Sequence, residues 1–121
     1  MKYDDNNVFA KILRGEIPCK KIYEDEFVLS FYDINPQKKV HALVIPKGKY
    51  TDLDDFSSNA SSEEMVGLLK GINTVAKKLG ISTDTGKGYR ALANISEDGG
   101  QEVPHLHFHL FGGEKIGKMV Q

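Results

Sequence analysis

The sequence has little of three features that would assign it to a special class of protein. It contains one cysteine, Cys19, so no disulfide can form within the chain. No apolar run approaches the roughly 20 residues that a membrane-spanning helix needs. The formal net charge is only -1, which gives no general attraction to nucleic acid or to anionic membranes. We therefore expect neither a nucleic-acid partner nor a membrane partner.

The first seven residues are polar and lack the apolar stretch of a secretory signal peptide. Together with the single cysteine, this predicts a cytoplasmic protein. A chain of 121 residues, 40% of them hydrophobic, can bury one sizeable core. No repeat, low-complexity segment or linker divides it, so we expect a single domain over residues 1–121.

Two helices are predicted from capping residues and apolar spacing. Asn6 or Asn7 can cap a short helix that ends at Gly15. Residues 61–64 form a capping box for a long helix that Gly80 stops, and residues 57–60 read as only a loop before it. The apolar stripe of the long helix is expected in the core and consists of Met65, Leu68, Leu69, Ile72, Val75, Ala76 and Leu79.

Five strands are predicted between and after these helices. They cover residues 21–23, 27–32, 40–45, 89–95 and 103–111, with turn residues between them. The order of elements favours an antiparallel sheet with one major helix packed on it, which is the α+β class.

Three histidines in the last predicted strand alternate with apolar residues. A strand places residues i and i+2 on the same face, so His105, His107 and His109 would share one side. Leu106, Phe108 and Leu110 would then enter the core. Three imidazoles on one face are a poor way to build a core, because each buried ring needs hydrogen-bond partners. We therefore expect the chemistry on this face.

Two kinds of site are compatible with these residues alone. Neutral imidazole is a common zinc ligand, and His41 could add a further ligand to the three histidines. Alternatively, Gly99, Gly100 and Gln101 offer flexible backbone N–H groups and an amide immediately before the histidines, which suits a phosphate.

A longer pattern surrounds the histidines. Asn94, Gly99, Gln101 and Val103 precede the run from 105 to 112, His-Leu-His-Phe-His-Leu-Phe-Gly, at fixed spacing. This pattern resembles the signature of the histidine triad (HIT) superfamily. It is similar in particular to the histidine triad nucleotide-binding, or Hint, branch, because the similarity also covers residues 7–12, 16–18, 31–37 and 41–47.

The resemblance implies a fold and an activity. The fold would be a five-stranded antiparallel sheet with one long and one short helix, and two subunits would pair as a homodimer. The activity would be that of a purine nucleoside phosphoramidase or nucleotidyl hydrolase, which releases a nucleoside monophosphate through a nucleotidyl-histidine intermediate and needs neither a metal nor another cofactor. The alternatives are a dinucleoside polyphosphate hydrolase and a non-catalytic nucleotide-binding module.

The resemblance also implies roles for particular residues. His107 would be the nucleophile, His109 would contact the phosphate oxygens, and His105 with His41 would form a supporting hydrogen-bonded group. Backbone N–H groups of residues 100–102 (Gly100, Gln101 and Glu102) and the side chains of Gln101 and Asn94 would hold the phosphate. Asp33 would bind the ribose hydroxyls, and the base slot would be formed by Phe9, Ile12, Phe31, Ile34 and Leu43.

Each nucleoside-binding assignment has a structural alternative. Asp33 could simply initiate a turn, and the five apolar residues could be ordinary core. One residue departs from the family pattern: Glu102 stands where many Hint proteins carry serine, so a hydroxyl near the leaving group is missing. We expect the Glu102 carboxylate to point toward solvent or a basic residue while its N–H still faces the phosphate.

Overall fold

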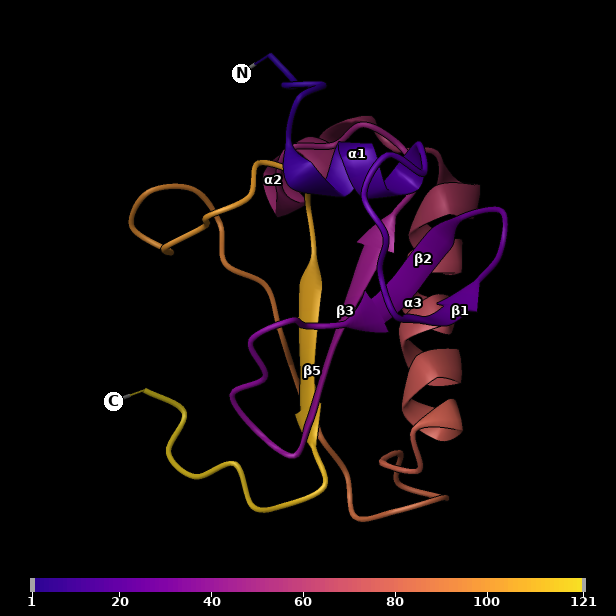
Figure 1. The fold of residues 1–121 in the computed structure, drawn as a ribbon, viewed down its shortest axis with the longest axis vertical. Coiled ribbons are helices and arrows are strands. Elements are labelled where there is room, and N and C mark those ends of the chain that lie inside the picture. The colour runs from indigo at the N-terminus through magenta and orange to yellow at the C-terminus, as the bar shows by residue number, and fades with distance from the viewer. Residues whose placement is uncertain (1, 121) are drawn as a thin grey trace.

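The computed structural model describes residues 2–120, so positions 1 and 121 of the predicted domain lie outside the described residues. Within that range the chain forms one five-stranded sheet of order β1-β2-β3-β5-β4, with every neighbouring pair antiparallel. The first four of these strands, β1, β2, β3 and β5, follow one another from right to left in Figure 1. The α+β prediction is confirmed. The elements are α1 (Val8–Leu13), β1 (Lys21–Glu24), β2 (Val28–Tyr32), β3 (Val40–Pro46), α2 (Leu53–Asn59), α3 (Ser62–Lys78), β4 (Arg90–Leu92) and β5 (Phe108–Gly112).

The two faces of the sheet carry different cores, because successive side chains of a strand point to opposite sides. On one face α3 packs across β1, β2 and β3. On the other face α1 covers the strands with the buried ring of Phe9. The α3 core is formed by Val28, Ala42, Val44, Phe56, Leu68, Ile72, Val75, Leu106 and Leu110, and the α1 core by Phe9, Leu29, Phe31, Leu43 and Ile45.

The predicted long helix is present with its predicted ends. Ser61 and Glu64 form the capping box, and Gly80 follows the helix with φ +71°. The expectation that Leu69 is buried is wrong, because 68% of the residue is exposed. The buried stripe instead includes Gly71, where an added Cβ would lie 2.7 Å from Val28. The buried face of α3 therefore excludes Leu69. Because Gly71 has no side chain, α3 can approach β2 closely at Val28.

A second short helix, α2, occupies part of the segment that was expected to be a loop. The Asp52 side chain caps it by accepting a hydrogen bond from the Asp55 N–H, and Phe56, three residues after Leu53, enters the core. A cap and an i, i+3 apolar pair were the only sequence signals, and a helix of 7 residues, about two turns, is too short to show a longer pattern. No helix in the described part of the chain is long and apolar enough to cross a membrane.

The last two strands are shorter than predicted. Pro104 has no N–H for a strand ladder, and the His105 N–H bonds the Val103 carbonyl at 2.9 Å, so a tight turn replaces the first half of the expected strand. β5 therefore begins only at Phe108. Because the partner segment is turned away, β4 also ends early, at Leu92, instead of continuing to residue 95.

Candidate active site

Four histidines meet on the α1 face of the sheet, and they come from two strands and a turn. His41 on β3 and His109 on β5 are positioned by the ladder that pairs His41 with Phe111 and Leu43 with His109. His105 and His107 precede β5, yet the rings of both lie nearly perpendicular to the Phe9 ring, with centroid separations of 6.3 and 4.9 Å. The predicted common face is therefore correct, although of the three triad histidines only His109 lies in a strand.

The hydrogen bonds of His107 assign its tautomer. Its Nδ1 lies 2.8 Å from the carbonyl oxygen of His105, which can only accept, so Nδ1 carries the proton and donates. The Nε2 atom of a neutral ring then keeps its lone pair. His107 is only 7% exposed. The site thus holds a buried, oriented imidazole nitrogen that keeps its lone pair.

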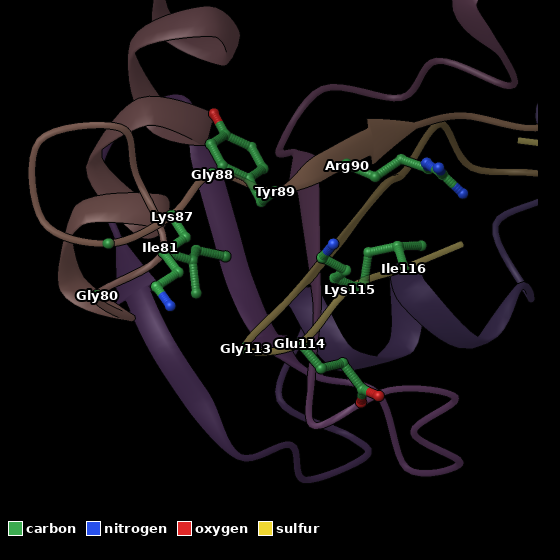
Figure 2. Close-up of a pocket in the computed structure, with 11 residues that line it drawn as sticks. Gly80, Ile81, Lys87, Gly88, Tyr89, Arg90, Gly113, Glu114, Lys115 and Ile116 are labelled. Carbon is green, nitrogen blue, oxygen red and sulfur yellow. The ribbon is translucent and has the colours of Figure 1, made fainter. Parts of the chain in front are cut away.

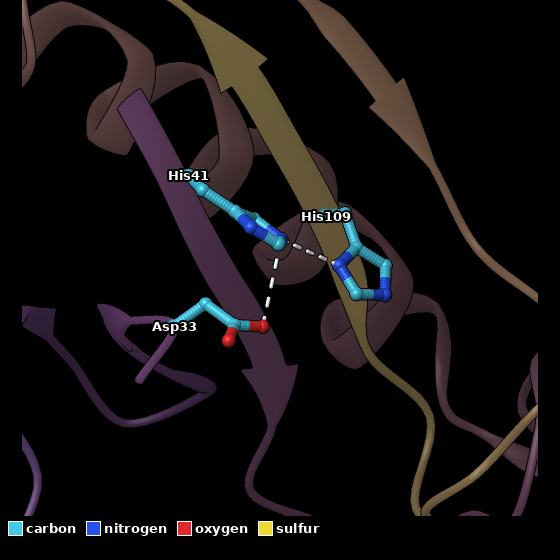
Figure 3. A group of neighbouring side chains, drawn as sticks. All are labelled: Asp33, His41 and His109. Carbon is cyan, nitrogen blue, oxygen red and sulfur yellow. Dashed lines mark hydrogen bonds and ion pairs between the residues drawn. The ribbon is translucent and has the colours of Figure 1, made fainter. Parts of the chain in front are cut away.

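A chain of hydrogen bonds assigns the tautomers of His41 and His109 in the same way. The Gln37 backbone N–H donates to His41 Nδ1 at 3.1 Å, so His41 carries its proton on Nε2. His41 Nε2 lies 2.9 Å from His109 Nδ1 and donates to it (Figure 3). His109 therefore has its own proton on Nε2 and can donate it to an anion. The centroids of the His107 and His109 rings lie 5.1 Å apart.

The expected pair of His105 with His41 does not form. His105 donates from Nε2 to the Pro46 carbonyl at 2.8 Å, and its Nδ1 is 2.6 Å from the Tyr3 hydroxyl. Both ring nitrogens are thus occupied, and the turn at Pro104 directs the ring toward the end of β3. His41 supports His109 instead.

Burial lowers the pKa of His105 to about 4, from the ordinary 6.5. Burial also lowers the pKa of His109 to about 4, with further contributions from the nearby rings of His107 and His41. The pKa values of His107 and His41 are lowered mainly by burial as well. Burial penalises the charged imidazolium, so all four rings are neutral at pH 7. A neutral imidazole carries one proton, as in the tautomers of His107, His41 and His109.

Asp33 makes the turn that its sequence context allowed and also lies beside the histidines. Its Oδ1 accepts a hydrogen bond from the Asn35 N–H at 2.8 Å, which makes the predicted turn. Its Oδ2 lies 3.5 Å from His41 Nε2, beside the histidines (Figure 3). The turn therefore fixes one carboxylate oxygen and turns the other toward the site.

Asp33, His41 and His109 also form the one candidate metal cluster among residues 2–120, with donor atoms within 4.8 Å of one another. The hydrogen bonds argue against an ion there. Gln37 N–H already donates to His41 Nδ1, so a metal on Nε2 would require His41 either to lose that bond or to become an anion. The three side chains therefore fit a hydrogen bond from His41 to His109 better than they fit a bound zinc ion.

The loop before the histidines is built differently from the expected phosphate cradle. The N–H groups of Gly100 and Gln101 donate to the carbonyls of Glu97 and Ser96, and the Gln101 amide bonds the backbone of Ser96, Thr51 and Val103. These donors shape the loop and are not free for an anion. The Glu102 N–H has no backbone acceptor within residues 2–120, and the Glu102 side chain is exposed as expected.

The residues of the expected base slot differ in how far they are buried. Phe9, Phe31 and Leu43 are at most 7% exposed and belong to the core beneath α1. Ile12 is half-buried, whereas Ile34 is 90% exposed. Only the last two thus offer surface to a ligand. Asn94 is half-buried after β4.

The chain matches the family model of the HIT domain over residues 14–116. It belongs to the HIT family. A purine nucleoside phosphoramidase from Escherichia coli K12 is 38% identical over 117 residues, which cover 96% of this chain and 94% of that protein. An uncharacterized 13.2 kDa HIT-like protein from Azospirillum brasilense is 55% identical over 118 residues, covering 98% of this chain and 94% of that protein.

Solved structures agree with this HIT assignment. A HIT family hydrolase from Clostridium thermocellum superposes with a TM-score of 0.85 at 39% identity, covering 98% of this chain and 99% of that chain. A protein described as Hit-like has a TM-score of 0.79 at 51% identity, covering 89% and 99% of the two chains. The relatives of this HIT domain therefore include hydrolases.

The Tyr3 hydroxyl and the Gln37 backbone N–H are among the partners of the HIT histidines that carry no sequence signal. Tyr3 lies 102 positions from His105 along the chain, and only the folded HIT domain brings them together. Gln37 acts through a main-chain group that every residue except proline possesses. Side-chain patterns could not have identified either contact.

A separate cavity of about 670 Å³ lies between the segment after α3 and the chain that follows β5 (Figure 2). None of the four histidines lines it. Arg90 at its edge donates to the carbonyls of Gly117 and Lys118, and the charged groups of Arg90, Lys87 and Glu114 point in different directions. We assign the chemistry to the histidines and not to this cavity.

Proposed function

We propose that this protein is a purine nucleoside phosphoramidase that works through a covalent nucleotidyl-His107 intermediate without a cofactor. The hydrogen bond from His107 Nδ1–H to the His105 carbonyl carries the proposal, because it leaves a buried neutral Nε2 lone pair as nucleophile. The E. coli relative named for this activity supports the choice of reaction.

In the first step, His107 Nε2 attacks the α-phosphorus and the P–N bond to the amine breaks. The amine leaves with the electron pair of that bond and takes a proton from water. His109 donates its Nε2–H to a phosphate oxygen, and His41 holds His109 in the required tautomer at 2.9 Å. A fixed donor at this position stabilises negative charge that develops on the phosphate.

In the second step, a water oxygen attacks the same phosphorus and the P–Nε2 bond breaks. Its electron pair returns to His107, the water loses a proton to solvent, and nucleoside monophosphate is released. Two displacements at phosphorus, in which the imidazole nitrogen is first the nucleophile and then the leaving group, are easier than one direct attack by water. Since neither step needs a Lewis acid, the proposal includes no metal.

The nucleoside would lie between Asp33 and the exposed apolar residues beside it. Asp33 Oδ2 is the carboxylate oxygen left free by the turn, and it would accept hydrogen bonds from the ribose hydroxyls. A purine would rest against Ile12 and Ile34, while Phe9, Phe31 and Leu43 would support the slot from the core.

For the phosphate we propose a revised set of contacts. The Glu102 N–H faces no backbone acceptor in the described part of the chain and would bind an oxygen directly. Gly100 and Gln101 would act by shaping the loop, because their N–H groups and the Gln101 amide are already bonded within it. Asn94 would be a further side-chain donor.

We also propose that two subunits pair as a homodimer and that the protein works in the cytoplasm. β4 has a single strand neighbour, β5, in the described sheet, so its other edge presents unpaired backbone groups that a second subunit could satisfy. The free Cys19 fits a reducing compartment.

The nucleophile is tested by His107→Asn. This variant should lose turnover of an adenosine phosphoramidate and keep nucleoside monophosphate affinity within about tenfold, a difference of about 1.4 kcal/mol. Intact-mass analysis after mixing with substrate should show a nucleotidyl adduct on the wild type only. Full activity in His107→Asn would refute the mechanism.

A substrate panel separates the alternatives. Faster cleavage of a dinucleoside polyphosphate than of the phosphoramidate would identify a polyphosphate hydrolase. Nucleotide binding with no turnover of any substrate would identify a binding module. Preferential cleavage of phosphoramidates supports the proposal.

A further inference from the structure

The first triad histidine is held by a residue from the opposite end of the chain. Tyr3 Oη lies 2.6 Å from His105 Nδ1, and the two rings meet edge to face with centroids 5.6 Å apart. His105 Nε2 lies 2.8 Å from the Pro46 carbonyl, which can only accept, so Nε2 carries the ring proton. Nδ1 is therefore an acceptor, and the Tyr3 hydroxyl donates to it.

The N-terminal segment is fixed in a way that keeps Tyr3 in place. The N–H and the side-chain amide of Asn7 both donate to the Asp4 carbonyl, and Arg14 donates to the Asp5 carbonyl at 2.8 Å. An ion pair of 2.8 Å joins Asp5 to Lys49, three residues after Pro46. The segment thus bridges α1 and the end of β3, and it places the phenol over His105.

The position of His105 in turn determines the state of His107. The His105 carbonyl is the acceptor that keeps the His107 proton on Nδ1, at 2.8 Å. His105 itself is completely buried, so a ring nitrogen without a partner would not find water. Without the phenol, the buried Nδ1 of His105 would lack a hydrogen-bond partner, and a shift of residue 105 that relieved this cost would also displace the His105 carbonyl that bonds His107.

We propose that Tyr3 is a positioning residue for the nucleophile, holding His105 so that the His105 carbonyl keeps His107 in the reactive tautomer. This inference rests on the proposed function for its kinetic consequence. Tyr3 is not among the substrate contacts proposed above, so it should act on the rate of the chemical step and not on nucleotide affinity.

Tyr3→Phe removes only the hydroxyl and tests the inference. We expect kcat for an adenosine phosphoramidate to fall about tenfold, with KM within about twofold. The imidazole 15N spectrum should report a lower fraction of the Nδ1–H tautomer for His107. Tyr23→Phe is the matched control, because it removes a half-buried hydroxyl that bonds Asp25 at 2.8 Å in the β1–β2 connection, and it should retain wild-type kcat and spectrum.

Two results would overturn the inference. One is a Tyr3→Phe variant with wild-type kcat and an unchanged His107 spectrum. The other is an equal loss of kcat in both variants without a change in the His107 tautomer, because that pattern indicates general destabilisation. If the wild type cleaves no phosphoramidate, the proposed function fails, and the 15N spectra alone then decide whether Tyr3 positions His107.

Discussion

Acidification should destabilise this protein, and the fully buried His105 is one group whose contribution can be isolated. The ring is fully buried, and burial lowers its pKa to about 4, whereas an unfolded chain gives it the ordinary value of 6.5. Between these two values the unfolded chain binds a proton at His105 and the folded protein does not. The free energy of unfolding must therefore fall as the pH is lowered through this window.

The size of the effect follows from the two pKa values. Each pH unit inside the window costs about 1.4 kcal/mol, so lowering the pH from 6.5 to about 4 should remove about 3 kcal/mol through His105. The loss begins below pH 6.5 and levels off near pH 4, where the folded protein also binds the proton. Solvent does not screen this ring, because it is 0% exposed.

Urea unfolding at pH 7, 6, 5 and 4.5 measures this dependence, with His105→Asn as the comparison. The variant has no ring to titrate, so its free energy of unfolding should fall less steeply than that of the wild type. Contributions of His109 and of the carboxylates are present in both proteins and cancel in the difference. Parallel pH profiles in the two proteins would refute the assignment of His105 as a buried neutral ring.

Three further experiments address chemistry and assembly. Exhaustive chelation should leave phosphoramidase activity unchanged, because no step needs a Lewis acid, whereas loss of activity with recovery on adding zinc would support a metal at Asp33, His41 and His109. Glu102→Ser should tighten substrate binding at low salt and change kcat/KM more for alkylamine phosphoramidates than for esters with good leaving groups, since basic amines depend most on a proton donor. Equal, near-zero changes across that series would mean that position 102 acts only through its backbone N–H. Light scattering at micromolar concentration should report a dimer, and a monomer at every accessible concentration would contradict the proposed pairing.

Several features of the fold could be predicted because their causes are local. The capping box at Ser61 and the glycine at position 80 define the ends of α3 by hydrogen bonds within a few residues. The alternation of His41, Leu43 and Ile45 on β3 assigns them to one face without knowledge of the partner strands. Periodicity also predicted the common face of the three triad histidines.

Other features were misjudged where a local signal was weak or was outweighed. The apolar alternation predicted one continuous last strand. This was wrong, because the turn at Pro104 interrupts it. The helix α2 has too few residues to show a period. Leu69 fits helical spacing, yet Gly71 defines which side of α3 meets the sheet.

The sequence by itself determined which residue types gather at the site, because the histidine pattern and the loop before it are contiguous. Only the tertiary structure decided how those histidines are bonded. His41 supports His109, while His105 bonds Tyr3 and Pro46, and these contacts join positions between 59 and 102 residues apart. A proton on one ring nitrogen depends on which group lies opposite it, and that neighbour is supplied by strand pairing and by the path of the N-terminal segment, neither of which a local pattern encodes.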